Sequence, residues 1–236
     1  MPAGERTEHI SAMDGGSFDA YTVLPGSGAG PGILLLQEIF GINVYIHGVA
    51  RRVADLGYVV MAPDLYWRIE PHVALAHDQK GVARGMEYAQ RFDPALGLQD
   101  CGTTLDHLRG LPEVTGRVAV LGFCFGGTLA YQVAARFEPD AAVSYYGSGV
   151  PGALEDADRI ACPTLFHFGG DDPYIPREQV DKARKALEPR SGIEFHVHEG
   201  AGHAFDNHEA PMFHNPDAAA AAWGITARFL RHHLPS

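Results

Sequence analysis

Residues 122–127 read Gly-Phe-Cys-Phe-Gly-Gly and directly follow the short apolar segment Val118–Leu121. This order matches the G-x-S-x-G pattern of a nucleophile on a strand-to-helix turn, with cysteine in place of serine. Glycines on either side allow the tight turn, and the positive end of the following helix favours a thiolate. The pattern therefore predicts that Cys124 is a nucleophile and that the backbone N–H of Phe125 stabilises an oxyanion.

An acid and a base follow two later apolar segments. Two aspartates, Asp171 and Asp172, come after Thr164–Phe168, and His203 comes after Phe195–Val197. The order nucleophile, acid, histidine is the one found in α/β-hydrolases. In that chemistry the histidine takes the thiol proton and later activates water, while the aspartate fixes the imidazole tautomer. Spacing alone leaves both aspartates open as the acid.

A third group of candidate residues follows the apolar segment Gly32–Leu36. Residues 37–41 read Gln-Glu-Ile-Phe-Gly and stand where the second oxyanion donor of such a site usually lies. The N–H of Ile39 is the candidate donor. Glu38 would bring a carboxylate to the same site, where its charge opposes formation of a thiolate unless it moves away or takes up a proton.

The elements that would position these residues alternate between strand and helix. An N-terminal hairpin is predicted around the turn at 14–16, with strands His9–Met13 and Phe18–Leu24. Further strands are predicted at Gly32–Leu36, Tyr58–Ala62, Val118–Leu121, Ala141–Tyr146, Thr164–Phe168 and Phe195–Val197. Helices are predicted at Tyr45–Leu56, Leu98–Leu108, Gly127–Phe137, Pro176–Leu187 and Asp217–His232, and within part of Val73–Phe92. This alternation predicts an α/β fold with a mostly parallel sheet flanked by helices on both faces, and with the site at the carboxyl ends of the strands.

Composition and charge narrow the class of protein. With 46% hydrophobic and 20% charged residues, the chain is predicted to form one globular domain over residues 1–236, and disorder is excluded. A net charge of −11 without basic runs argues against nucleic-acid binding. No apolar run is long enough to span a membrane. Three sparse cysteines and the absence of a secretory signal favour a cytoplasmic protein. We expect a monomer or a small homo-oligomer.

Taken together, these segments and several others resemble the dienelactone hydrolases, or carboxymethylenebutenolidases. The matching segments are 37–41, 62–66 (Ala-Pro-Asp-Leu-Tyr), 122–127, 145–147 (Tyr-Tyr-Gly), 170–172 with the Ile-Pro pair at 175–176, and 202–203 followed by Phe205. The resemblance implies a single-domain α/β-hydrolase fold and a Cys124–His203–Asp172 triad, with Asp172 preferred because it lies three residues before the Ile-Pro pair. It also implies that Glu38 is a gate, which holds the sulfur out of position in the resting state until substrate binding releases it toward His203.

The activity implied by this resemblance is hydrolysis of the ester bond of a small lactone or ester, through a thioester acyl-enzyme and without a cofactor. Family members that act on dienelactone bind its free carboxylate with arginines. Here Asn207 occupies one of those places, beside the acidic Asp206, and Val82 the other, with Arg84 nearby and Arg68 earlier in the chain. A small ester or lactone is therefore implied more strongly than dienelactone itself. Candidate pocket residues are Phe40, Trp67, Arg84, Tyr146, Phe205 and Asn207.

Two alternative functions remain open from the sequence. A catalytically silent relative could bind a small ligand, and the same triad could serve a thioesterase or another carboxylester hydrolase. Thirteen histidines raise the question of a metal, and His196 and His198 share one strand face. No Cys pair or His-Glu-x-x-His motif frames them, so no metal site is predicted. Cys101 and Cys162 are predicted to be buried and without a paired base.

Overall fold

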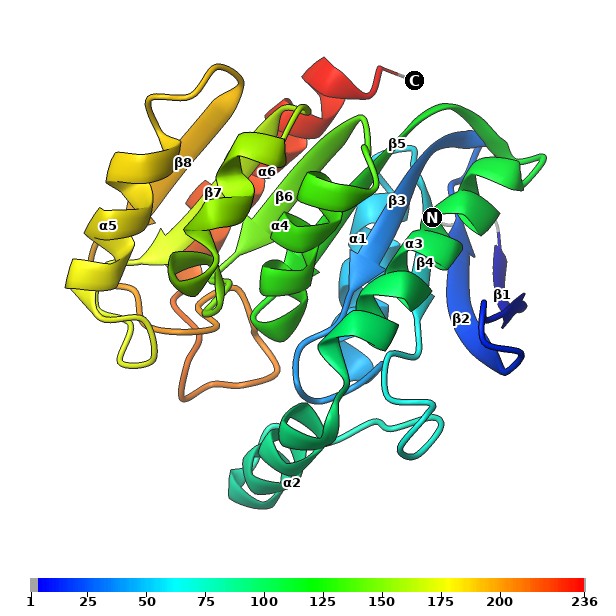
Figure 1. Ribbon diagram of the computed structural model, residues 1–236, viewed down its shortest axis with the longest axis horizontal. Coiled ribbons are helices and arrows are strands. Elements are labelled where there is room, and N and C mark those ends of the chain that lie inside the picture. The colour runs from blue at the N-terminus through cyan, green and yellow to red at the C-terminus, as the bar shows by residue number, and fades with distance from the viewer. Residues whose placement is uncertain (1–3, 236) are drawn as a thin grey trace.

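One sheet of eight strands runs through residues 4–235, which are the residues that the computed structural model describes (Figure 1). The strands are β1 (Gly4–Ser11), β2 (Ser17–Leu24), β3 (Gly30–Leu36), β4 (Val59–Pro63), β5 (Val114–Phe123), β6 (Ala141–Tyr145), β7 (Thr164–Gly169) and β8 (Ile193–His198). Their order across the sheet is β1-β2-β4-β3-β5-β6-β7-β8. β2 pairs antiparallel with β1 and β4, and every pair from β4–β3 to β7–β8 is parallel.

Helices cover both faces of this sheet. They are α1 (Val44–Ala54), α2 (Gln79–Arg91), α3 (Pro94–Gly110), α4 (Phe125–Arg136), α5 (Arg177–Leu187) and α6 (Pro216–His233), with 3₁₀ turns η1 (Val150–Gly152) and η2 (Leu154–Arg159). α1 and α6 lie behind the sheet in the view of Figure 1, and α3, α4 and α5 lie in front. The predicted α/β fold with a mostly parallel sheet is confirmed.

Continuous burial of the central strands explains their unbroken apolar sequences. Every residue of β3 is buried, because a parallel strand with helices on both faces has no solvent side. Consecutive residues point to opposite faces. Ile33 packs in the core layer of α1, with Val49 and Val53, whereas Leu34 packs in the core layer of α3, with Leu105.

Every helix begins or ends one or more residues from its predicted bounds, and the two largest shifts, at the starts of α2 and α3, come from local caps. In the segment Val73–Phe92 only α2 is helical, since the Asp78 side chain accepts a hydrogen bond of 2.7 Å from the N–H of Gly81 and starts the helix there. α3 begins at Pro94, earlier than predicted, because Asp93 caps the N–H groups of the first turn and proline fits the first helical position.

The carboxyl ends of β3, β5, β7 and β8 meet at one edge of the sheet, and α2 stands at that edge apart from the sheet (Figure 1). This arrangement brings together residues that lie far apart in the chain. Among residues 4–235, no helix combines the length and hydrophobicity that a membrane crossing requires.

Candidate active site

Cys124 lies on a sharp turn between β5 and α4. Its backbone has φ 54° and ψ −114°, a strained conformation for a residue with a side chain, and costs of this kind are about 1–3 kcal/mol. The turn is possible because glycines flank it at close approach. A Cβ atom at Gly122 would lie 2.0 Å from the carbonyl oxygen of Gly126, and a Cβ at Gly126 would lie 2.3 Å from the carbonyl oxygen of Leu36. The predicted turn is therefore held by two obligatory glycines.

A line of hydrogen bonds joins Cys124, His203 and Asp172. The Nε2 atom of His203 lies 3.1 Å from Sγ of Cys124, and its Nδ1 atom lies 2.7 Å from Oδ2 of Asp172. The other carboxylate oxygen of Asp172 accepts hydrogen bonds from the backbone N–H groups of Tyr174, at 2.8 Å, and Ile175, at 3.1 Å. These bonds hold the carboxylate in one orientation, which in turn holds the imidazole toward the sulfur.

The structure distinguishes the two adjacent aspartates. Asp172 is buried and contacts His203, whereas the side chain of Asp171 is exposed and only its backbone N–H is engaged, with the carbonyl of Ala201 at 3.0 Å. The Ile-Pro pair follows Asp172 closely, so the backbone N–H of Ile175 can donate to this carboxylate.

Electrostatics at His203 favour the imidazolium form. Burial alone would lower the pKa of His203, but the Cys124 sulfur and the Asp172 carboxylate outweigh burial and hold that pKa well above its ordinary value. An imidazolium at hydrogen-bond distance from the sulfur is the partner that a thiolate nucleophile requires.

Two residues that line the cavity with Cys124 have backbone N–H groups without an acceptor among residues 4–235. Neither Ile39 nor Phe125 donates its N–H to any group within residues 4–235, and both residues line the cavity that contains Cys124. The N–H of Gly126 donates to the carbonyl of Gln37 at 2.9 Å and so ties the start of α4 to the loop after β3. This arrangement fits an oxyanion site formed from two separate segments.

Glu38 lines the same cavity, and its carboxylate is hydrogen-bonded to Asn207 and not to the sulfur of Cys124. Its side chain is 1% exposed, its Oε2 accepts a hydrogen bond of 2.7 Å from Nδ2 of Asn207, and its Oε1 has no partner among the described residues. Because Sγ of Cys124 is at hydrogen-bond distance from His203, the resting arrangement expected from the resemblance, with Glu38 holding the sulfur away, is not the one that the structure adopts.

His77 is a neighbour of Glu38 that sequence reasoning missed. Its Nε2 lies 3.5 Å from Oε2 of Glu38, and it faces Nδ2 of Asn207 at 2.9 Å and of Asn43 at 3.2 Å. Both asparagines use their side-chain oxygens as acceptors for backbone N–H groups, of Ile46 and residue 209, so their amide nitrogens donate to His77. Nε2 of His77 is therefore positioned to accept from these amides.

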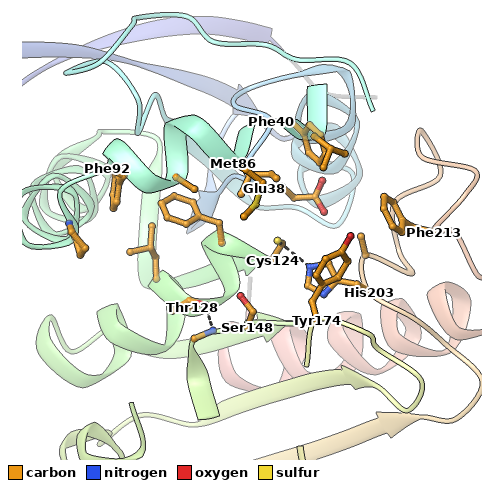
Figure 2. A pocket seen from close by; sticks show the side chains of 18 of the residues that line it. Glu38, Phe40, Met86, Phe92, Cys124, Thr128, Ser148, Tyr174, His203 and Phe213 are labelled. Carbon is orange, nitrogen blue, oxygen red and sulfur yellow. Dashed lines mark hydrogen bonds between the residues drawn. The ribbon is translucent and has the colours of Figure 1, made fainter. Parts of the chain in front are cut away.

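The cavity around these groups has a volume of about 590 Å³, within the range of small-molecule sites. Figure 2 shows Cys124 between one end marked by Phe92 and another marked by Tyr174 and Phe213. The lining residues are Glu38, Ile39, Phe40, Val82, Met86, Ala89, Phe92, Pro94, Cys124, Phe125, Thr128, Leu129, Gln132, Ser148, Gly149, Tyr174, His203, Ala204 and Phe213. Of the candidate pocket residues named from the sequence, Phe40 is the one that lines this cavity.

Trp67 and Arg84 lie outside the cavity, which corrects their expected place. The ring of Trp67 stacks on Phe18 with centroids 5.6 Å apart, and its Nε1 donates to Asp100 at 2.9 Å. Arg84 projects from the outer side of α2, where Nη1 bonds Glu87 at 2.6 Å. Both side chains satisfy their polar groups with acidic partners elsewhere, so neither is directed to the site.

Three further candidates lie behind the site instead of lining it. Tyr146 and Phe205 are fully buried, and the ring of Tyr146 packs against His203 with centroids 5.3 Å apart. Asn207 is also fully buried and contacts the site only through Glu38. These residues pack beneath His203 and Glu38, because the segment after His203 turns back into the core.

The cavity residues that the sequence analysis missed come largely from α2. Val82, Met86 and Ala89 line one wall, and their spacing places them on one face of a helix. That spacing was visible in the sequence, but nothing local indicated which side of the molecule the face would cover.

The histidine-rich end of β8 forms no metal cluster. No group of three or more His, Cys, Asp or Glu side chains in the described part of the chain has a metal-binding arrangement. His198 is instead paired with the fully buried His167, whose Nδ1 lies 3.0 Å from Nε2 of His198.

The eight-stranded sheet, the nucleophile turn after β5 and the bonded Cys–His–Asp line are together those of an α/β-hydrolase. Residues 18–234 match the sequence profile described as the dienelactone hydrolase family. The chain belongs to the dienelactone hydrolase family and is a carboxylic ester hydrolase.

Individual relatives agree with this membership. The chain is 35% identical over 227 residues to a carboxymethylenebutenolidase of Pseudomonas sp. strain P51, covering 96% of this chain and 94% of that one. It is 34% identical to a carboxymethylenebutenolidase of Pseudomonas putida, covering 83% and 84%. Among solved structures, a putative dienelactone hydrolase from Klebsiella pneumoniae superposes with a TM-score of 0.80 at 26% identity, covering 96% of both chains. The predicted α/β-hydrolase fold is thereby confirmed.

Proposed function

We propose that the protein hydrolyses small carboxylic esters or lactones by acyl transfer to the sulfur of Cys124. The observation that carries this proposal is the 3.1 Å separation of Sγ and Nε2 of His203, with the Asp172 carboxylate 2.7 Å from Nδ1 on the opposite side of the ring. This is the geometry in which a thiol can pass its proton to a base that a carboxylate orients.

In the first half of the reaction, the thiolate of Cys124 attacks the carbonyl carbon and a C–S bond forms. Negative charge develops on the carbonyl oxygen, and the N–H groups of Ile39 and Phe125 stabilise it. The C–O bond to the leaving alcohol then breaks, and the imidazolium of His203 gives its proton to the departing oxygen. With a lactone, the alcohol remains attached to the acyl chain.

In the second half, water attacks the thioester carbonyl. His203, now neutral, takes a proton from this water, and the same two N–H groups hold the oxyanion. The C–S bond breaks, the carboxylic acid is released, and the thiolate–imidazolium pair of Cys124 and His203 is restored. Asp172 stays ionised throughout and orients the ring.

Glu38 is proposed to act as a gating carboxylate through its position. While Asn207 holds Oε2 at 2.7 Å, the carboxylate is kept from Sγ and the sulfur stays with His203. Rotation of Glu38 toward Cys124 would place a second negative charge beside the thiolate and suppress its formation. The hydrogen bond from Asn207 therefore supports the active arrangement.

The mechanism also bears on the cellular compartment. Cys101, Cys124 and Cys162 are all free thiols, and the proposed reaction requires Cys124 to stay reduced. We propose a reducing compartment, the cytoplasm, as the place of action.

Substitution of the nucleophile tests the proposal. We expect Cys124→Ala to lower kcat/KM for p-nitrophenyl acetate by at least about a thousandfold. Mass spectrometry of the wild-type protein during turnover should find the acetyl group on Cys124. Cys162→Ser, at a thiol outside the cavity, is the matched control and should keep full activity. Undiminished hydrolysis by the Cys124→Ala variant would exclude this mechanism, and a wild-type protein without esterase activity would favour a silent, ligand-binding relative.

A further inference from the structure

The cavity beside Cys124 contains no positively charged side chain other than His203. No lysine or arginine of residues 4–235 lines it. The ionisable side chains in its wall are those of Glu38, Cys124, Tyr174 and His203. Glu38 adds a carboxylate to this wall. Asn207 donates to it, His77 lies 3.5 Å from the same oxygen, and no lysine or arginine of residues 4–235 pairs with it. A substrate group with negative charge would thus find no partner there except the catalytic imidazole.

Apolar side chains form most of the remaining wall. Val82, Met86 and Ala89 of α2 and Phe125 and Leu129 of α4 all line the cavity, and Figure 2 shows Phe92 on the side away from His203. A surface of this kind favours alkyl chains and aromatic rings, because their burial removes apolar area from water. A free carboxylate placed against it loses hydration without gaining hydrogen bonds.

Three arginines lie close in sequence to residues of this wall, and none of them lines the cavity. Arg91, next to Phe92, is exposed at the end of α2. Arg84 lies on α2, but its Nη1 bonds Glu87 at 2.6 Å and its guanidinium lies 4.6 Å from the ring centroid of Tyr88. Arg136 lines a neighbouring hollow and pairs with Asp156 at 3.0 Å. Neither guanidinium is available to a ligand in the cavity as the side chains are arranged.

We propose that the site selects uncharged, apolar esters, with an alkyl chain or an aromatic ring in the cavity, and discriminates against substrates that bear a free carboxylate. This inference rests on the proposed ester hydrolysis and names its substrate class. The discrimination arises from two causes: the desolvation of an unpaired carboxylate and its repulsion by Glu38.

Three matched substrates test the inference on the full chain. They are p-nitrophenyl hexanoate, the p-nitrophenyl monoester of adipic acid, in which a carboxylate replaces the terminal methyl group, and the methyl ester of that compound, which has the same length without the charge. We expect kcat/KM for the charged monoester to be at least about tenfold below that for its methyl ester.

Two variants distinguish the effect of a cation placed in the cavity from the effect of the same charge placed elsewhere on the protein. Met86 is 47% exposed at the cavity wall, so Met86→Arg can add a cation there without filling the core. We expect this variant to raise the activity ratio of charged monoester to methyl ester by at least about fivefold. Met13→Arg adds the same charge at an exposed position in the N-terminal hairpin, and should leave activity toward all three substrates unchanged.

The possible results distinguish a failure of the proposed substrate class from a failure of the proposed ester hydrolysis. If the wild-type protein hydrolyses the charged monoester as efficiently as its methyl ester, or if Met86→Arg leaves their ratio unchanged, the proposed selectivity is overturned while ester hydrolysis stands. If none of the three esters is hydrolysed, the proposed function fails, and the substrate class fails with it.

Discussion

Asn207 donates a hydrogen bond of 2.7 Å to Glu38, joining two buried side chains that are 169 positions apart in the chain. The other neighbour of that carboxylate oxygen is His77, whose facing nitrogen is itself an acceptor of amide hydrogen bonds. A buried negative charge is thus stabilised by a neutral amide at the wall of the cavity.

The variant Asn207→Ala tests how much the hydrogen bond between Asn207 and Glu38 contributes to stability. Removing the amide leaves the buried Glu38 carboxylate without its donor, and we expect the free energy of unfolding to fall by about 1–3 kcal/mol. Urea denaturation of Asn207→Ala, of Glu38→Ala and of the double variant would measure the coupling, because each single substitution removes one partner of the bond. Strictly additive effects of the two substitutions would show that the hydrogen bond contributes nothing.

Thiol reactivity should differ sharply among the three cysteines. Burial raises the pKa of both Cys101 and Cys162, which keeps these thiols protonated, whereas Cys124 is partly exposed and faces the imidazole of His203. We expect iodoacetamide to alkylate Cys124 at least about tenfold faster than either of the others. Peptide mass spectrometry over a time course would measure the three rates. Equal alkylation of Cys124 and Cys162 would contradict the assigned nucleophile.

The burial of His198 beside His196 predicts acid sensitivity of the fold. Burial, and then the charge of His196, lowers the pKa of His198 from 6.5 to about 4. Between these two values the unfolded chain binds more protons than the folded one, so stability is fully present above the unfolded pKa and is lost as pH falls toward the folded one. Because His198 is only partly buried, we expect a loss of about 1–2 kcal/mol from this group.

Denaturation curves at several pH values would check that the free energy of unfolding falls as the pH falls. His198→Gln should flatten the decline in unfolding free energy between pH 6.5 and about 4, while His232→Gln, at an exposed position on α6, should leave the decline unchanged. A decline of equal steepness in the His198→Gln variant would assign the acid sensitivity to other groups.

An ion pair between the buried Asp206 and the partly buried Arg52, beneath the site, should contribute strongly to stability. Arg52 donates to Asp206 at 2.7 Å, and the same carboxylate oxygen accepts from the hydroxyl of Tyr45 at 2.7 Å. Arg52→Ala would leave the Asp206 carboxylate, whose side chain has no exposed area, without its cation, at a cost of about 3–5 kcal/mol.

The neighbouring arginine supplies the matched control. Arg51 on the same helix pairs with Glu5 at the surface, and Arg51→Ala should cost less than about 1 kcal/mol. Thermal or urea denaturation of the two variants would compare them. Similar losses from both substitutions would contradict the distinction between the buried pair and the surface pair.

Local sequence was sufficient for the central strands, for the turn at Cys124 and for the order cysteine, aspartate, histidine along the chain, whereas β1 spans Gly4–Ser11 and not the predicted His9–Met13. An apolar run such as Gly32–Leu36 is buried in any parallel sheet, so its place could be read without knowing its neighbours. The glycines at 122 and 126 act over a few bonds, and their requirement is steric and local. The preference for Asp172 came from the family resemblance, whereas spacing left Asp171 open.

Tertiary structure alone decided which side chains meet. Trp67 and Arg84 could have faced the site by their place in the sequence, yet Asp100 of α3 holds Trp67, and Glu70 together with Glu87 holds Arg84, away from it. His77 reaches Glu38 from a loop whose path depends on the cap of α2, and no local pattern encodes that path. Contacts between distant segments depend on how whole elements pack, because a side chain's partner is set by the sum of many weak interactions elsewhere.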